Sequence, residues 1–202
     1  MNLLTQNSKI KKTNKKLGTR LFNFGIPAYK SATGKMTCPF ADKCVKFCYA
    51  KKGAYTWSNV KPAFERRYQA TLRDDFASVM IEEIKAKKAT HIRVHDSGDY
   101  YSPKYLQKWL AIAEALPDVK FYSYTNSISF FKGLELPSNY DVIFSDSGKQ
   151  VGLIDYTKDR FTKIFKSEEE LTNQGFINAS EIDLFATKFF NPTNKKVGLI
   201  YH

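Results

Sequence analysis

Short β-rich runs alternate with amphipathic helical stretches along most of the chain. Two helical stretches precede the β-rich run at 91–95, and a third, opened by Ser102, precedes the run at 119–125; another run follows at 141–145. Strands that alternate with helices join through right-handed crossovers into a mostly parallel sheet. The sequence therefore predicts an α/β fold, either a partial (β/α) barrel or an open, mostly parallel sheet.

The flanking parts of the chain carry signals of the same kind. Ser167 and Glu170 have the spacing of a capping box, which predicts a short helix that ends near Gly175. The segment 31–53 is expected to be a loop. Further strands are expected at 21–28, 160–165 and 197–201.

The chain is long and apolar enough for one folded domain, because 43% of its 202 residues are hydrophobic. We expect a basic tail or arm at 1–18 and a single α/β domain at 19–202. The N-terminal stretch lacks the apolar core of a signal peptide, and no apolar run is long enough to span a membrane. A cytoplasmic location without membrane contact is therefore predicted.

The net charge of +12 favours anionic partners such as nucleic acid, nucleotides or phosphorylated small molecules. The alternative is that the charge serves only solubility and a loose basic tail. The oligomeric state is not predicted. Much of the excess lies on lysines of the tail and of one later cluster: Lys9, Lys11, Lys12, Lys15, Lys16, Lys85, Lys87 and Lys88.

The three cysteines lie within eleven residues, as Cys38-x5-Cys44-x3-Cys48. An odd number of cysteines so close together cannot form a disulfide framework. One short loop can instead wrap three thiolates around a metal centre, and iron–sulfur clusters and zinc both prefer thiolate ligands. A 4Fe–4S cluster on three cysteines leaves one iron open to another residue, water or a small molecule, and an open position is typical of metal sites that carry out chemistry. The cysteines are therefore predicted to be metal ligands.

Zinc is the main alternative metal. It would be held by the three cysteines with His95 or His91 as the fourth ligand. A reactive thiol would not need three cysteines, and cysteines that are only small buried hydrophobic residues would not need to be clustered. The spacing favours a metal and leaves iron and zinc both open.

A polar turn, His95-Asp96-Ser97-Gly98-Asp99, ends the β-rich run at 91–95. In parallel α/β sheets, ligands bind at the carboxyl edge of the strands. Asp96 or Asp99 would suit ribose hydroxyls or an amino group, and His95 would suit a metal or a proton transfer. The structural alternative is an Asx-type turn in which aspartate caps the helix near Ser102.

The next two predicted strands also end in polar residues. The carboxyl ends of parallel strands share one edge of a sheet, so these ends should lie side by side, with the cysteine loop nearby. A small molecule at the open iron would then face a polar pocket. The predicted pocket consists of His95, Asp96, Ser97, Asp99, Tyr124, Asn126 and Ser145.

Three segments taken together resemble a phage and prophage family labelled gene product 88. They are Thr37-Cys38-Pro39 through Cys44 to Phe47-Cys48-Tyr49-Ala50, then 93–102 (RVHDSGDYYS) and 121–125 (FYSYT). The resemblance covers roughly residues 20–150. It implies no established activity, but it implies a phage-encoded protein in the cytoplasm of an infected or lysogenic host cell.

The layout is also similar to that of radical SAM enzymes. In that family a three-cysteine loop follows the first strand of a partial (β/α) barrel, and a later strand end binds the amino group of S-adenosylmethionine. Here the spacing differs from the usual Cys-x3-Cys-x2-Cys, and 96–99 (DSGD) stands in place of a Gly-Gly-Glu-Pro type motif. The resemblance implies S-adenosylmethionine as a possible cofactor and radical chemistry started by an electron from the cluster. The other mechanism open to an enzyme is that the open iron acts as a Lewis acid on a small molecule without redox change.

A function of another class is also consistent with the sequence. The protein would then be a nucleic-acid-binding or host-interaction phage protein, in which a cluster or zinc serves structure. The net charge of +12 suits this alternative. Nucleic-acid binding that weakens steeply with salt would support it, whereas binding of S-adenosylmethionine would support an enzyme.

Overall fold

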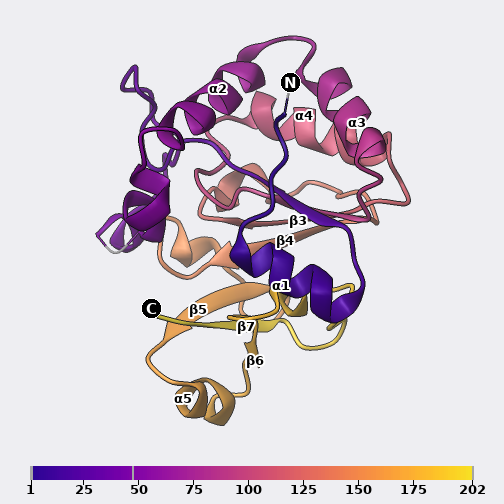
Figure 1. Cartoon of the computed structure of the whole chain (residues 1–202). Helices are drawn as coiled ribbons and strands as arrows, with labels where there is room; N and C mark the ends of the chain where they lie inside the picture. Colours follow the sequence, from indigo (N-terminus) through magenta and orange to yellow (C-terminus); the bar gives the residue numbers. More distant parts are fainter. Residues whose placement is uncertain (1, 47, 202) are drawn as a thin grey trace.

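The computed structural model, which describes residues 2–46 and 48–201, is built on one parallel seven-stranded sheet (Figure 1). The strand order is β1-β2-β3-β4-β5-β7-β6, and every neighbouring pair is parallel. The sheet curls into a half-barrel, which confirms the predicted α/β class. The strands are β1 Leu21–Phe24, β2 His91–Val94, β3 Lys120–Thr125, β4 Tyr140–Ser145, β5 Phe161–Phe165, β6 Ile177–Asn178 and β7 Lys196–Ile200.

The described part of the chain also contains five α-helices and six short 3₁₀ helices. Helices α2, α3 and α4 cover one face of the sheet, and α1 lies on the other face (Figure 1). The α-helices are α1 Ser8–Leu17, α2 Lys61–Leu72, α3 Phe76–Ala86, α4 Pro103–Glu114 and α5 Glu168–Asn173. The 3₁₀ helices are η1 Lys43–Val45, η2 Tyr49–Lys51, η3 Gly53–Thr56, η4 Ile128–Phe130, η5 Val151–Leu153 and η6 Asp183–Ala186.

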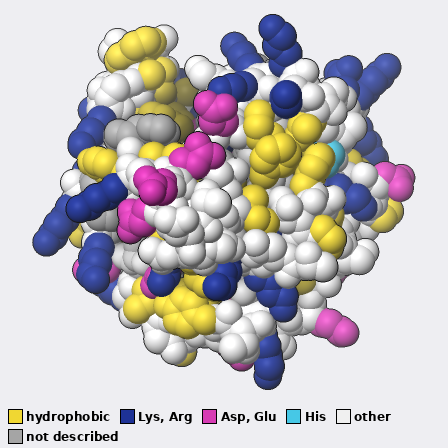
Figure 2. All heavy atoms as spheres, turned by 90° about the horizontal axis from the view of Figure 1, so that it is seen from below, with side chains coloured by type: hydrophobic (Ala, Val, Ile, Leu, Met, Phe, Trp, Pro, Cys, Tyr) yellow, Lys and Arg dark blue, Asp and Glu magenta, His cyan; other side chains and the backbone are white. Residues whose placement is uncertain are grey.

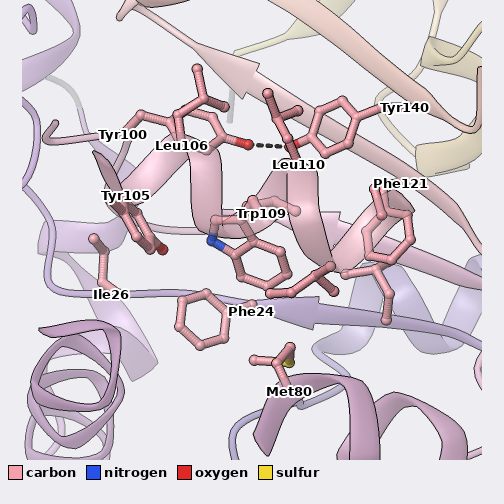
Figure 3. Close-up of a cluster of buried hydrophobic side chains, with 14 of the residues drawn as sticks. Phe24, Ile26, Met80, Tyr100, Tyr105, Leu106, Trp109, Leu110, Phe121 and Tyr140 are labelled. Atoms are coloured by element: carbon pink, nitrogen blue, oxygen red, sulfur yellow. Dashed lines mark hydrogen bonds between the residues drawn. The ribbon is translucent and has the colours of Figure 1, made fainter. Parts of the chain in front are cut away.

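The main core lies between the sheet and helices α3 and α4 (Figure 3). Trp109 of α4 is fully buried, and the ring of Phe24 meets it edge-on at 5.1 Å between centroids. Met80 of α3 and Phe121 of β3 complete this part of the core. Side chains alternate along a strand, so Tyr122 points to the opposite, concave face, where it packs with Ile10 of α1.

The N-terminal segment differs from the tail or arm expected at 1–18. The Asn7 side chain caps α1 by accepting from the N–H of Ile10, and Gly18 ends the helix with a left-handed φ of 65°. Leu3 and Leu4 are buried, and their N–H groups donate to the carboxylate of Glu83 at 2.8–2.9 Å. Residues 2–18 therefore pack on the domain. The capped ends of α1 and the buried side chains stabilise this packing, although the helix carries several exposed lysines.

Most of the predicted elements form close to their expected positions. The first strand is shorter than the predicted 21–28, because it leaves the sheet at Gly25. The Ser167 hydroxyl accepts from the N–H of Glu170 at the start of α5, as the capping pattern predicts. The expected loop at 31–53 contains the short helices η1 and η2 and the start of η3.

Candidate functional site

The cysteine loop lies against the carboxyl ends of β2 and β4. The N–H of Asp99, just after β2, donates to the carbonyl of Thr37 at 2.9 Å. The N–H of Lys149, after β4, donates to the carbonyl of Phe40 at 2.8 Å. These backbone contacts hold the loop at the sheet edge where ligands of parallel α/β proteins bind.

The three cysteines are half-buried in this loop and none forms a disulfide. The Sγ of Cys38 accepts from the N–H of Tyr29 at 3.3 Å, and the Sγ of Cys44 lies 3.8 Å from the Nδ2 of Asn126. Burial raises the pKa of the Cys38 thiol, and the Asp99 carboxylate and the other two cysteines raise it further. The thiols of Cys44 and Cys48 therefore lie close enough to Cys38 to affect its pKa.

Within 2–46 and 48–201, no three His, Cys, Asp or Glu side chains converge on a point where a single metal ion would sit. His91 lies at the start of β2, at the opposite edge of the sheet from the cysteine loop. His95 lies in the aromatic core. The zinc alternative therefore lacks its histidine ligand in this conformation.

His95 occupies the core rather than the polar pocket. Its φ of 68° breaks the alternation of the strand, so its ring turns towards α4. The Nε2 lies 2.9 Å from the hydroxyl of Tyr105, and the ring meets that of Tyr100 at 4.6 Å. Burial lowers the pKa of His95 to about 3, and Arg93 adds to this shift. His95 is thus a neutral, buried side chain at physiological pH.

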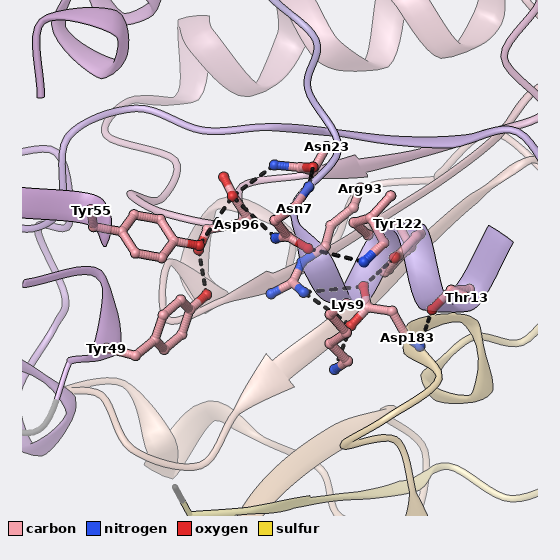
Figure 4. A network of polar contacts seen from close by, with 11 residues as sticks. Asn7, Lys9, Thr13, Asn23, Tyr49, Tyr55, Arg93, Asp96, Tyr122 and Asp183 are labelled. Atoms are coloured by element: carbon pink, nitrogen blue, oxygen red, sulfur yellow. Dashed lines mark hydrogen bonds and ion pairs between the residues drawn. The ribbon is translucent and has the colours of Figure 1, made fainter. Parts of the chain in front are cut away.

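Asp96 is the centre of a buried polar network (Figure 4). Its Oδ2 accepts from the Nδ2 of Asn23 at 2.7 Å and from the hydroxyl of Tyr55 at 3.2 Å. Its backbone carbonyl accepts from the hydroxyl of Tyr49. Its Oδ1 is buried without a hydrogen-bond partner among the described residues. Burial raises the pKa of Asp96, against Arg93 and Arg67, which lower it.

Asp99 joins the ends of β2 and β3. Its Oδ1 accepts from the hydroxyl of Thr125 at 2.6 Å and from the N–H of Tyr100 at 2.7 Å, and its Oδ2 accepts from the N–H of Asn126 at 2.8 Å. Burial raises its pKa to about 6, and these hydrogen bonds limit the rise. Asp99 therefore fixes Asn126, whose amide contacts Cys44, and it does not cap α4, whose N-cap is Ser102.

The remaining predicted pocket residues occupy different surroundings. Ser97 is buried, its carbonyl accepts from the N–H of Ile26 at 3.0 Å, and it lines a cleft beside α2. Tyr124 points to the concave face, where the guanidinium of Arg93 lies 5.0 Å from its ring. Ser145 is half-buried at the end of β4. The structure thus brings Asp99 and Asn126 to the cysteine loop, and it places Asp96, Ser97, Tyr124 and Ser145 along the same edge.

A buried ion network on the concave face was not predicted (Figure 4). The guanidinium of Arg93 donates to the carboxylate of Asp183 at 3.0 and 3.1 Å, and the ammonium of Lys9 lies 2.6 Å from the same group. The hydroxyl of Tyr122 also donates to Asp183. Arg93 and Asp183 are 90 residues apart in the chain, and no local sequence pattern marks such a pair.

The fold and the site define a class: a parallel α/β half-barrel whose carboxyl edge carries three cysteines beside buried carboxyl and amide groups. Comparison of the sequence with known families places the chain in one family of this class. The family model described as gene product 88 matches residues 1–198, so the chain belongs to this family. This confirms the family resemblance seen in the cysteine and strand-end motifs.

Two phage proteins illustrate the family. The chain is 27% identical to the Gene 88 protein of Mycobacterium phage L5 over 116 residues, which cover 51% of this chain and 46% of that protein. It is 27% identical to the Gene 88 protein of Mycobacterium phage D29 over 138 residues, which cover 61% of this chain and 55% of that protein. The chain thus spans about half the length of the curated relatives it matches.

No solved structure matches the chain. The comparisons therefore give no support to the resemblance to radical SAM enzymes. None of the described helices has the length and apolar character needed to cross a membrane.

Proposed function

We propose that Cys38, Cys44 and Cys48 bind a 4Fe–4S cluster and leave one iron open to a small molecule. The observation that carries this proposal is the position of the cysteine loop on the carboxyl edge of the sheet, next to Asp99 and Asn126. The thiolates of a cluster bind different irons, so they do not have to converge on one point as the ligands of a single ion do.

The surroundings of the thiols suit sulfur ligands. The N–H of Tyr29 and the amide of Asn126 point at Cys38 and Cys44, and hydrogen bonds to sulfur are a means by which proteins tune such clusters. Burial raises the pKa of Cys38, so without a metal this thiol is protonated at neutral pH. Metal binding would release that proton, and the site would therefore bind more tightly as pH rises.

Polar groups along the same edge would bind the small molecule. The Oδ1 of Asp96, the Oδ1 of Asn126 and the hydroxyl of Tyr124 are buried without hydrogen-bond partners in the described part of the chain. Together with Ser97 and Ser145 they would receive hydroxyl or amino groups. His95 is left out of this pocket, because it lies in the core.

A cluster with an open iron supplies either an electron to S-adenosylmethionine or a Lewis acid for a small molecule. The proposal of an enzyme rests on this open position and on the partnerless polar groups. S-adenosylmethionine as cofactor is the finer proposal. Calorimetric titration of the cluster-loaded protein with S-adenosylmethionine tests it, and an absence of binding would leave only Lewis-acid chemistry.

Anaerobic purification followed by a visible spectrum tests the cluster itself. We expect a brown protein with equal amounts of iron and sulfide. Cys44→Ser should lose the colour, whereas Ser58→Ala, an exposed change shortly after the loop, should keep it. A colourless wild-type protein that contains one zinc per chain would refute the proposal.

A further inference from the structure

A cleft of about 1150 Å³ lies between helix α2 and parts of the loops 27–32 and 50–56. Ser97 also lines it, so it opens beside the polar turn that follows β2. Pockets for drug-sized ligands occupy about 300–1,000 Å³. The cleft is therefore large enough for a ligand of more than one building block.

The inner wall of the cleft is apolar and partly aromatic. Phe64 of α2 lines the cleft and is largely buried, and the ring of Tyr55 lies 5.5 Å from the ring of Phe64. Pro27 and Pro62 extend this wall. A flat, partly apolar ring system would pack on such a surface.

The rim of the cleft is strongly basic. Its cations are exposed and come from both sides, and Glu65 is the acidic lining residue. Glu65 is already engaged, because its carboxylate accepts from the N–H of Ala32 and from Gln69, both at 2.9 Å. Lys61 and Arg66 have no acidic partner among the described residues. The rim cations are Lys30, Lys51, Lys61, Arg66 and Arg73.

The segment that forms this cleft is strongly basic. Residues 27–73 contain ten Lys or Arg and two Asp or Glu, a net +8 of the total +12. Residues 74–202 contain sixteen Lys or Arg and eighteen Asp or Glu. On the face shown in Figure 2, Lys and Arg side chains are spread among acidic, hydrophobic and uncharged ones. Residues 1–26 carry a further +6, with six Lys or Arg and no Asp or Glu, so the segment with the cysteine loop and α2 carries the largest share of the net charge.

An exposed tryptophan follows directly on the cleft-lining residue Thr56. Trp57 is 61% exposed, although tryptophan is usually well buried. Proteins that bind single-stranded nucleic acid combine a basic groove, which follows the phosphates, with aromatic side chains, on which bases stack. The cleft, its rim and Trp57 have this combination.

We propose that the cleft between α2 and the cysteine loop binds single-stranded nucleic acid. The rim cations contact the phosphates, and bases pack on Tyr55, Phe64 and Trp57. This inference goes beyond the proposed cluster and does not rest on it. The rim cations and the three aromatic residues are not among the proposed ligands of the cluster.

Fluorescence anisotropy with a labelled fifteen-nucleotide thymidine oligonucleotide tests the proposal on the full-length, anaerobically purified protein. The test variant is Lys61→Glu with Arg66→Glu, both exposed on α2. The control is Lys104→Glu with Lys166→Glu, which makes the same change in net charge at exposed positions outside the cleft lining. Circular dichroism shows whether each variant is folded.

We expect micromolar binding at low salt, weakened at least tenfold by the test variant and less than threefold by the control. For single strands, each phosphate contact contributes about −0.7 to the slope of log K against log of the salt concentration. The test variant removes two cations, so the magnitude of its slope should be smaller by about twice that amount. The oligonucleotide should also quench Trp57, since the other tryptophan, Trp109, is fully buried.

Three results would overturn the proposal. They are no binding by the wild-type protein at low salt, equal weakening by both double variants, and equally tight binding of a duplex of the same sequence. Vesicles that contain phosphatidylserine test a membrane surface as the anionic partner instead. Binding to these vesicles without binding to the oligonucleotide would also count against it.

Discussion

The side-chain amide of Asn126 lies 3.8 Å from the Sγ of Cys44. The same residue donates its backbone N–H to Asp99 at 2.8 Å, so the end of β3 holds the amide against the cysteine loop. The cysteine loop, which follows β1, is thus tied to a strand that comes much later in the chain. This contact is the most direct link between the thiols and the polar strand ends.

Replacing Asn126 by Ala should weaken the hold on the metal without removing a ligand. Substitution of groups that hydrogen-bond to metal ligands typically costs about 10–100-fold in metal affinity. We therefore expect iron to be released faster from Asn126→Ala than from the wild-type protein when a chelator is added. Asn59→Ala, at an exposed position, is the control. Equal release rates for Asn126→Ala and wild type would show that the amide does not support the metal.

The pH dependence of stability should reveal the buried Asp183 network. Burial raises the pKa of Asp183, but Arg93 and Lys9 outweigh burial and lower it to about 2. The pKa of an aspartate in an unfolded chain is about 3.9. The unfolded state therefore binds the proton first, and stability falls as pH drops from about 4 to about 2, by roughly 2–3 kcal/mol.

Asp183→Asn should remove this acid-dependent loss. It should also lower stability by about 3–5 kcal/mol at neutral pH, because the buried Arg93 loses its partner. Urea unfolding at several pH values measures both effects. Glu181→Gln, two residues away and exposed, should change little. If Asp183→Asn and the wild-type protein lose stability in parallel below pH 4, the network does not act as described.

Gly25 is a point of close approach between the first strand and the site. A Cβ on Gly25 would lie 2.1 Å from the Oδ1 of Asp96 and 2.6 Å from the ring of Phe64. Gly25→Ala should therefore lower stability by about 1–3 kcal/mol through overpacking. A Cβ on Gly152 would have no neighbour within 4 Å, so Gly152→Ala should be neutral or slightly stabilising. Thermal unfolding compares the two, and equal melting temperatures would argue against the close approach.

Helix α1 should contribute to the stability of the domain. Ile10 is fully buried against Tyr122 and Leu184 on the concave face. Ile10→Ala should cost about 2–5 kcal/mol, whereas Lys11→Ala, on the exposed side of the same helix, should cost little. Urea unfolding gives both values. A cost near zero for Ile10→Ala would mean that residues 1–18 behave as the loose arm that their charge suggests.

The parallel sheet and the helices α2 to α4 are predictable from the sequence because their signals are local. Apolar residues recur at helical spacing, and Ser102 with a following proline marks the start of α4. Helix α1 has a cap at Asn7 and a stop at Gly18, but its apolar stripe is short among five lysines. Its burial depends on the concave face of the sheet, which no local pattern describes.

The candidate site is predictable in part for the same reason. The polar strand ends and the cysteine loop share an edge because the strands are parallel, and this follows from topology alone. The orientation of His95 depends on a positive φ, and the partner of Arg93 is 90 residues away. Both features depend on the tertiary structure, so no local sequence pattern indicates them.

Mössbauer spectroscopy of protein loaded with iron-57 shows whether the three cysteines hold a 4Fe–4S cluster with one open iron. Three cysteine ligands and one open position predict a 4Fe–4S cluster in which one iron differs from the other three. The signal of that one iron should change when a small molecule binds to it. Cys38→Ser, Cys44→Ser and Cys48→Ser should each lose the cluster signal. A spectrum with four equivalent irons, or a protein that takes up no iron and sulfide, would show that the cysteines hold no such cluster.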